Sequence, residues 1–200
     1  MTQQHHIKYR HDYRAPDYTI TDIDLTFALD AAATRVTAVS QVKRLGDAQA
    51  ELRLDGEALT LIAIEVDGSP WSAYRQEEGA LVLSQLPEQF QLKIVNDIHP
   101  DKNTALEGLY QSGEALCTQC EAEGFRHITW YLDRPDVLAR FTTTIIADEA
   151  RYPYLLSNGN RIDGGKAEQG KHWVKWQDPF PKPCYLFALV AGDFDVLRDS

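Results

Sequence analysis

Alternation of apolar and polar residues is the dominant pattern of this chain after residue 18. In the stretch ITDIDLTFALD, the apolar side is formed by Ile23, Leu25, Phe27 and Leu29. This period of two is typical of β-strands that have one buried and one solvated face. We count at least six such strands within the first hundred residues, and almost no helical periodicity. The chain therefore predicts an all-β fold.

Two Asp-Gly pairs lie between alternating runs and indicate turns. Asp55-Gly56 separates ELRL from the run EALTLIAIEV, and Asp67-Gly68 follows that run directly. Asp-Gly favours a tight hairpin because both central residues of such a turn adopt positive φ. We expect a hairpin at each of the two pairs.

The middle of the chain changes character. The stretch from NDIHPDKN to WYLDRPD is long and lacks sustained alternation, which predicts one long loop with a functional role. DRPDVLARF then predicts a short helix, with Asp133 as N-cap and Val137, Leu138 and Phe141 facing inward. Strands resume at FTTTIIAD, HWVKWQ and CYLFALVAGDF, the last apolar enough to be buried on both faces. We expect a large, mostly antiparallel β-sandwich or saddle-like domain with one long functional loop and one short helix.

Composition excludes several classes of partner. The 200 residues carry a net charge of −10, which argues against nucleic acid because phosphates would be repelled. No apolar run approaches the roughly 20 residues that span a bilayer, so we expect no membrane partner. The first residues, MTQQHHIKYRHDYRAPDY, lack the apolar segment of a secretory signal. With three cysteines, an odd number, the chain predicts a cytoplasmic protein in a reducing compartment.

The motif LCTQCEAEGFRH raises the question of a zinc or redox site. Cys117 and Cys120 form a Cys-x-x-Cys pair, but a structural zinc site needs four ligands and only Cys184 remains among the cysteines. A site that adds Cys184 and His127 has no support from spacing. A redox pair belongs at the start of a helix in a βαβ unit, whereas this region is expected to be loop. We interpret these sulfurs as packing groups.

Histidines provide no alternative metal site. His5, His6 and His11 lie in a polar tail, and His-Glu-x-x-His occurs nowhere in the sequence. We expect neither catalytic residues nor metal ligands in this segment, and no cofactor bound to it.

Gln119 and Glu121 are the remaining candidates. They stand two positions apart, so both side chains leave an extended segment by the same face. A carboxylate beside an amide oxygen suits an ammonium group, because the anion balances the charge and the amide accepts a further N–H bond. From the residues alone, Glu121 is one carboxylate among 30 acidic residues, and an ordinary solvated surface position explains it better than a binding role does.

Five short motifs resemble the N-terminal domain of the zinc-dependent aminopeptidase N family. EGLYQS, TQCE, YLDRPDVLARF, LLSNGN and CYLFALVAGDF stand in the family's order between about residue 105 and residue 194. The whole chain looks closest to the bacterial cytosolic branch of that family. The residues that carry the resemblance are Gly108, Leu109, Tyr110, Ser112, Thr118, Gln119, Glu121, Asp133, Pro135, Ala139, Phe141 and Ser157 to Gly159.

The resemblance implies a zinc metallopeptidase that releases single amino acids from peptides with a free N-terminus, as in peptide catabolism. Glu121 would bind the substrate's α-ammonium group, and Gln119 would line the first side-chain pocket. Zinc and the catalytic residues would belong to a following domain, whose Gly-x-Met-Glu-Asn and His-Glu-x-x-His motifs are absent from these 200 residues. The resemblance thus implies that this chain is a fragment or excised domain, inactive alone, whose partners are the peptide and the catalytic domain.

The expected organisation is a tail over residues 1–17, a β-sandwich domain over 18–194 and, over 195–200, the start of a connection to the catalytic domain. A competing hypothesis is a non-catalytic β-sandwich module that binds glycan or protein. Exposed aromatic side chains would form its platform. The candidates are Trp71, Tyr74, Trp130, Tyr131, Trp173 and Trp176.

Overall fold

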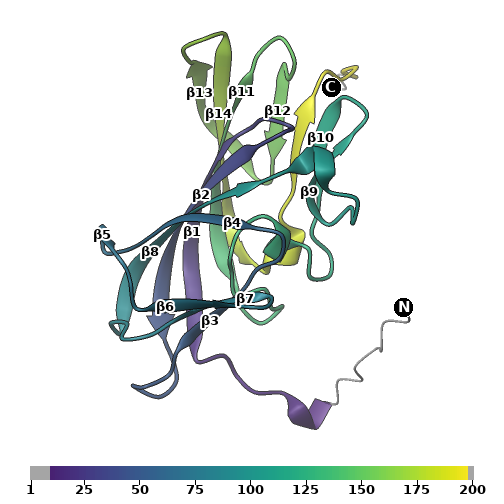
Figure 1. Ribbon diagram of the computed structural model, residues 1–200. Helices are drawn as coiled ribbons and strands as arrows, with labels where there is room; N and C mark the ends of the chain where they lie inside the picture. Colours follow the sequence, from purple (N-terminus) through teal and green to yellow (C-terminus); the bar gives the residue numbers. More distant parts are fainter. Residues whose placement is uncertain (1–9, 198–200) are drawn as a thin grey trace.

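The computed structural model describes residues 10–197, which form three β-sheets (Figure 1). Residues 1–9 of the expected tail and 198–200 of the expected connection lie outside the described residues. The large sheet has eight strands. In spatial order these are β13 (Asn160–Lys166), β14 (Lys171–Lys182), β11 (Ala139–Asp148), β1 (Tyr18–Ala28), β2 (Thr34–Arg44), β8 (Gln89–Ile98), β4 (Thr60–Val66) and β5 (Ser69–Pro70).

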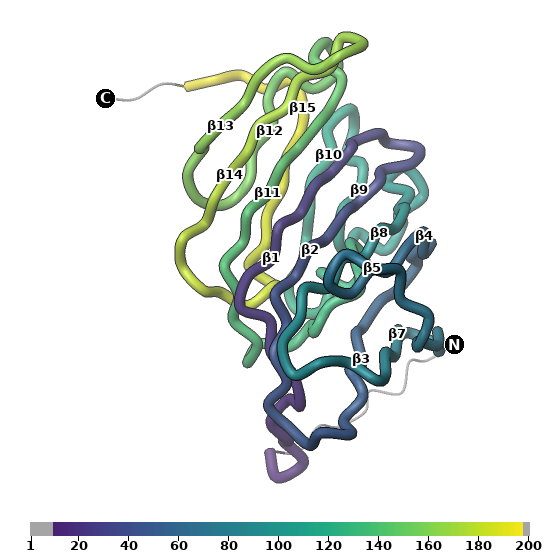
Figure 2. The backbone as a smooth tube through the Cα atoms, turned by 90° about the vertical axis from the view of Figure 1, so that its left-hand side faces the viewer, coloured from purple at the N-terminus to yellow at the C-terminus, as the bar shows by residue number. Residues whose placement is uncertain are grey.

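Two smaller sheets accompany the large one. Figure 2 shows β15, β10 and β9 behind β11, β1 and β2. The four-stranded sheet contains β12 (Tyr154–Ser157), β15 (Leu189–Gly192), β10 (Ala115–Gln119) and β9 (Gly108–Ser112). The three-stranded sheet contains β3 (Leu52–Asp55), β7 (Ala80–Leu83) and β6 (Tyr74–Glu77). Four 3-10 helices complete the described chain: η1 (Arg10–Asp12), η2 (Pro100–Lys102), η3 (Phe125–His127) and η4 (Cys184–Leu186). No helix among residues 10–197 is long and apolar enough to cross a membrane.

Strand β1 shows how the alternating pattern produces this architecture. It lies inside the large sheet, antiparallel to β2 and parallel to β11. A β-bulge between Ile20 and Asp22 shifts the alternation by one residue, so that Ile20 and the later Ile23, Leu25 and Phe27 are all buried. The other strand pairs of the described chain are antiparallel. The predicted all-β, mostly antiparallel fold is therefore confirmed.

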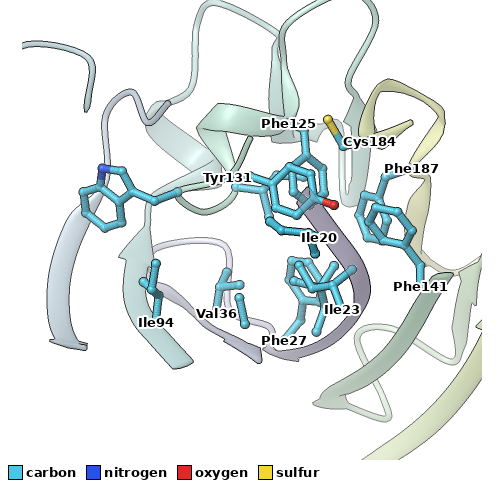
Figure 3. Close-up of a cluster of buried hydrophobic side chains, with 14 of the residues drawn as sticks. Ile20, Ile23, Phe27, Val36, Ile94, Phe125, Tyr131, Phe141, Cys184 and Phe187 are labelled. Carbon is cyan, nitrogen blue, oxygen red and sulfur yellow. The ribbon is translucent and has the colours of Figure 1, made fainter. Parts of the chain in front are cut away.

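An aromatic cluster joins the large sheet to the segment that follows β10 (Figure 3). The ring of Phe125, from η3, has its centroid 5.0 Å from that of Tyr131, 5.9 Å from Phe141 and 5.4 Å from Phe187. Phe187 also stacks on Phe27 of β1 at 6.0 Å. Phe125 is fully buried, so η3 is fixed to the core by its first residue.

The helix predicted over DRPDVLARF does not form. Residues 133–138 make an irregular turn, and β11 begins at Ala139. The expected N-cap, Asp133, instead accepts hydrogen bonds from Arg126 and Cys184. Pairing with β1 then holds the following residues extended, and Leu138, expected to face inward, is 49% exposed.

One of the two predicted hairpins forms, and the other is corrected, as is the last predicted strand. The turn at Asp67-Gly68 connects β4 to β5 as expected, with positive φ at both residues. The turn at Asp55-Gly56 does not form a hairpin, because β3 pairs with β7 rather than with β4. The continuous strand expected over CYLFALVAGDF is divided into η4 and β15, and Leu186 of η4 is 49% exposed.

Candidate functional site

Strand β10 brings Gln119 and Glu121 to one end of the four-stranded sheet. Gln119 is the last residue of β10, and Glu121 lies in the turn that follows, so the extended geometry expected from their spacing ends between them. Both residues are exposed. The Nε2 atom of Gln119 donates to the backbone oxygen of Glu121 at 3.3 Å, which holds the start of the turn against the strand. The region predicted as one long loop thus contains the β9–β10 hairpin.

The turn is exposed at its tip and buried at both ends. Cys120 and Gly124 are buried, and the Gly124 N–H donates to the Cys120 oxygen at 2.9 Å. A Cβ atom at Gly124 would lie 2.5 Å from the Gln119 oxygen, so only glycine fits there without a shift. Exposed Glu121 is therefore carried by a short segment whose two ends are fixed by packing.

Glu121 lines a hollow of about 680 Å³. The hollow is bordered by more carboxylates than basic groups, so its walls favour a cation over an anion. Two arginines each have a carboxylate partner: Arg134 forms an ion pair with Asp136 at 2.6 Å, and Arg126 with Asp133 at 2.9 Å. The lining residues are Tyr13, Asp55, Glu121, Ala122, Glu123, Arg126, Asp133, Arg134, Pro135, Asp136 and Tyr185.

The Asp133 carboxylate is the centre of a buried polar group beneath the hollow. Its side chain is 2% exposed. One oxygen accepts from the Arg126 backbone N–H at 3.1 Å and from Arg126 Nε at 2.9 Å, and the other accepts from Cys184 Sγ at 3.1 Å. Burial alone would lower the pKa of Arg126, but its hydrogen bond to Asp133 and the surrounding carboxylates raise the pKa instead. The guanidinium remains charged.

Asp55 lies beside this pair. Burial raises the pKa of its carboxyl, and the Arg126 charge offsets only part of that rise. The pKa of Asp55 is higher in the folded state than in the unfolded state. Its ionisation therefore destabilises the fold as the pH rises through the interval between the two pKa values.

We expect Asp55→Asn to stabilise the protein most at neutral and higher pH. At a pH below 3.8, the ordinary pKa of an aspartate, Asp55 is protonated in the folded and the unfolded state. The variant and the parent should then unfold at similar temperatures. Thermal unfolding of the full-length variant between pH 4 and pH 8 measures the difference. The matched control is Glu78→Gln, an exposed carboxylate in the turn after β6, which should shift unfolding little at any pH. A difference that falls with rising pH would contradict the expectation.

The cysteines do not form a metal centre with His127. Cys120 is buried, and its surroundings raise the pKa of its thiol to about 12, so it stays protonated at neutral pH. The pKa of Cys184 is raised for the same reason, burial first and the nearby Asp133 second. His127 Nε2 faces two carboxylates instead, Glu107 at 3.2 Å and Glu57 at 3.6 Å. Residues 10–197 contain no group of three or more potential ligands arranged for a metal ion, so this segment does not fit a zinc site.

Sequence reasoning missed most of the walls of the hollow. The sequence predicts a helix cap at Asp133 and indicates no role for Arg126. Tyr13, in the expected tail, donates to Asp136 at 3.0 Å across 123 positions of sequence. The signal in the sequence was the high density of charged residues in CEAEGFRH and LDRPD. It did not reveal which charges pair.

The aromatic platform of the competing hypothesis is not formed by the six candidate residues together. Trp130 and Tyr131 are buried at 6% and 1% exposure. The side chains of Trp71, Trp173 and Trp176 are partly buried, and Tyr74 is 40% exposed.

Comparison with known proteins identifies sequences similar to nearly all of this chain. A family model described as the peptidase M1 N-terminal domain matches residues 18–186. Aminopeptidase N of Escherichia coli (strain K12) is 72% identical over 200 residues, which are 100% of this chain and 23% of that protein. Aminopeptidase N of Haemophilus influenzae is 55% identical over 196 residues, covering 96% of this chain and 23% of that protein. The chain thus spans about a quarter of the length of these relatives.

Solved structures share the fold. The structure of Legionella pneumophila aminopeptidase A in complex with aspartic acid superimposes with a TM-score of 0.88 at 34% identity, covering 93% of this chain and 22% of that one. An M1 zinc metallopeptidase from Deinococcus radiodurans gives a TM-score of 0.76 at 15% identity, covering 88% of this chain and 42% of that one. At that identity the second comparison concerns the fold alone.

Proposed function

We propose that this chain is the substrate-anchoring domain of a zinc-dependent aminopeptidase. The premise is that the chain belongs to the family of peptidase M1 N-terminal domains. The longer protein would release single amino acids from peptides that have a free N-terminus. The relatives named aminopeptidase N, of which this chain matches 23%, support this assignment. Zinc and the groups that bind it would lie in the remainder of the longer protein.

The contribution of this domain is recognition of the substrate's free end. An enzyme that removes one residue at a time must distinguish the α-ammonium group from an internal amide. A fixed carboxylate does so, because a charge-assisted hydrogen bond to an ammonium is about twice as strong as one between neutral groups. Glu121 is the residue that we assign to this task, and we assign Gln119 to the lining of the first side-chain pocket.

One observation carries the proposal most directly. Glu121 is exposed on a turn whose ends are buried, at the border of a hollow in which the arginines already have carboxylate partners. No ion pair within residues 10–197 involves Glu121. Its carboxylate is therefore available to a cation that comes from outside this chain.

The domain boundaries and the location belong to the same proposal. Residues 18–194 would form the domain and 195–200 would lead toward the catalytic domain, in agreement with a family match over 18–186. The acidic composition and the odd number of cysteines support a cytoplasmic protein.

The experiment that tests the function compares a free and a blocked N-terminus. Full-length protein is given an aminoacyl 4-nitroanilide and the N-acetylated form of the same compound. Acetylation removes the positive charge that Glu121 would bind, so we expect kcat/KM to fall by about 100-fold or more. Equal hydrolysis of both compounds, or hydrolysis of neither, would overturn the proposed function.

A further inference from the structure

The hollow that would bind an ammonium group also contains a permanent cation. Arg126 lines the same hollow as Glu121, and its side chain is only 16% exposed. A guanidinium is charged at every physiological pH. Left without a partner, it would repel an incoming ammonium and compete with it for Glu121, because charges interact more strongly where water is partly excluded.

The buried Asp133 carboxylate balances the charge of Arg126. The Asp133 carboxylate accepts from the backbone N–H and from Nε of Arg126, and Arg126 Nη2 donates to the Asp133 backbone oxygen at 3.3 Å. The other arginine contacts are longer: Nη1 lies 3.5 Å from Glu123 and 3.9 Å from Glu57. Asp133 is therefore the principal counter-ion of Arg126, and it is nearly inaccessible to solvent.

The same carboxylate also holds the segment that carries Glu121. Arg126 follows Glu121 by five positions, on η3, whose first residue is part of the aromatic cluster. The bond from Cys184 Sγ to Asp133 joins this segment to η4. Asp133 thus connects its own segment to η3, seven positions earlier, and to η4, which carries Cys184 51 positions later.

We infer that Asp133 is a positioning residue for substrate binding, which neutralises Arg126 and holds it away from the ammonium site that Glu121 provides. This inference rests on the proposed function of Glu121. It assigns to the Arg126–Asp133 pair a role in affinity for the charged end of the substrate, in addition to a role in folding.

The test removes first one charge and then both in the full-length protein. Asp133→Asn keeps the shape and a hydrogen-bond acceptor but removes the principal counter-ion of Arg126, so we expect KM to rise about tenfold with kcat within about twofold. The double variant Arg126→Gln with Asp133→Asn removes the competing cation as well. Its KM should return to within about threefold of the parent. A purely structural pair predicts the opposite, because the double variant would be at least as impaired as the single one.

A matched control comes from another Asp–Arg pair. Asp22 and Arg140 form an ion pair at 2.7 Å on the large sheet, and neither lines the hollow that contains Glu121. Asp22→Asn should leave KM unchanged. If Asp133→Asn alone does not fold, the double variant decides: a KM near the parent value is expected, and a tenfold increase overturns the inference.

Glu121→Gln distinguishes failure of this inference from failure of the proposed function. If Glu121→Gln leaves kcat and KM unchanged, the proposed function is wrong and the inference falls with it. If Glu121→Gln impairs binding but Asp133→Asn does not, only the inference is overturned. When both changes are combined, Asp133→Asn should raise KM by much less than it does alone, because the carboxylate for which the guanidinium competes is absent.

Discussion

Glu121→Gln in the full-length protein should lower kcat/KM for a free aminoacyl substrate by about 30- to 5,000-fold, which corresponds to the roughly 2–5 kcal/mol lost when one partner of a desolvated charge pair is truncated. The substitution preserves size and one acceptor oxygen, replaces the other oxygen by an NH2 group and removes the charge. The free energy of unfolding should change by less than about 0.5 kcal/mol, because Glu121 is exposed and lies outside the core. Steady-state kinetics and a thermal scan measure the two effects.

Glu114→Gln is the matched control for this substitution. Glu114 is an exposed carboxylate in the turn of the β9–β10 hairpin, and it does not line the hollow. Glu114→Gln removes the same charge at the opposite end of β10 and should leave kcat/KM within about twofold. Normal turnover by Glu121→Gln, or an equal loss in both variants, would contradict the assignment of the ammonium anchor to Glu121.

Phe125→Ala should destabilise this domain by about 3–5 kcal/mol, the range observed when a buried phenylalanine is truncated in a core. Phe125 is fully buried and contacts the rings of Tyr131, Phe141 and Phe187. Phe125 is also the first residue of η3, which follows the turn that carries Glu121. Loss of its ring should therefore raise KM as well as destabilise the domain. Hydrogen exchange of the β1 and β11 amides in the full-length protein measures the stability of this domain directly.

The control for Phe125→Ala is the same substitution at an exposed site. Phe180, on β14, is 75% exposed, and Phe180→Ala should change the free energy of opening by no more than about 0.5 kcal/mol. Similar exchange rates of these amides in Phe125→Ala and the parent would contradict the expected destabilisation by loss of the Phe125 ring.

The fold class could be predicted from sequence because most strands carry their own signal. The alternation in β1 identified its buried face, but the bulge after Ile20 could not be read, since a bulge depends on the partner strand as much as on the strand itself. The same limit explains the Asp55-Gly56 turn. Asp-Gly marks a change of direction, but whether the flanking strands pair is decided by distant strands, here β7.

The sequence supplied candidate residues for the site but not their surroundings. Gln119 and Glu121 were singled out by their chemistry and spacing, and a family resemblance gave them a role that stays a prediction; the structure shows them at the end of β10 and in the turn that follows it. Asp133 was misread because its sequence context, before Pro135 and apolar residues, is that of a helix cap. Its actual partners, Arg126 and Cys184, lie seven and 51 positions away, and no local pattern specifies them.

The parallel pairing of β1 with β11 determines how the domain must assemble as it emerges from the ribosome. Asp22 and Arg140, which face each other in that pairing, are 118 positions apart, while β2 follows β1 directly. At a synthesis rate of about 5–20 residues per second, β1 waits on the order of ten seconds for its second neighbour. During that interval one edge of a long, half-apolar strand offers its backbone N–H and C=O groups to any other extended chain. In nascent chains of this domain, that edge of β1 therefore stays without its β11 partner until Arg140 and its neighbours have been synthesised.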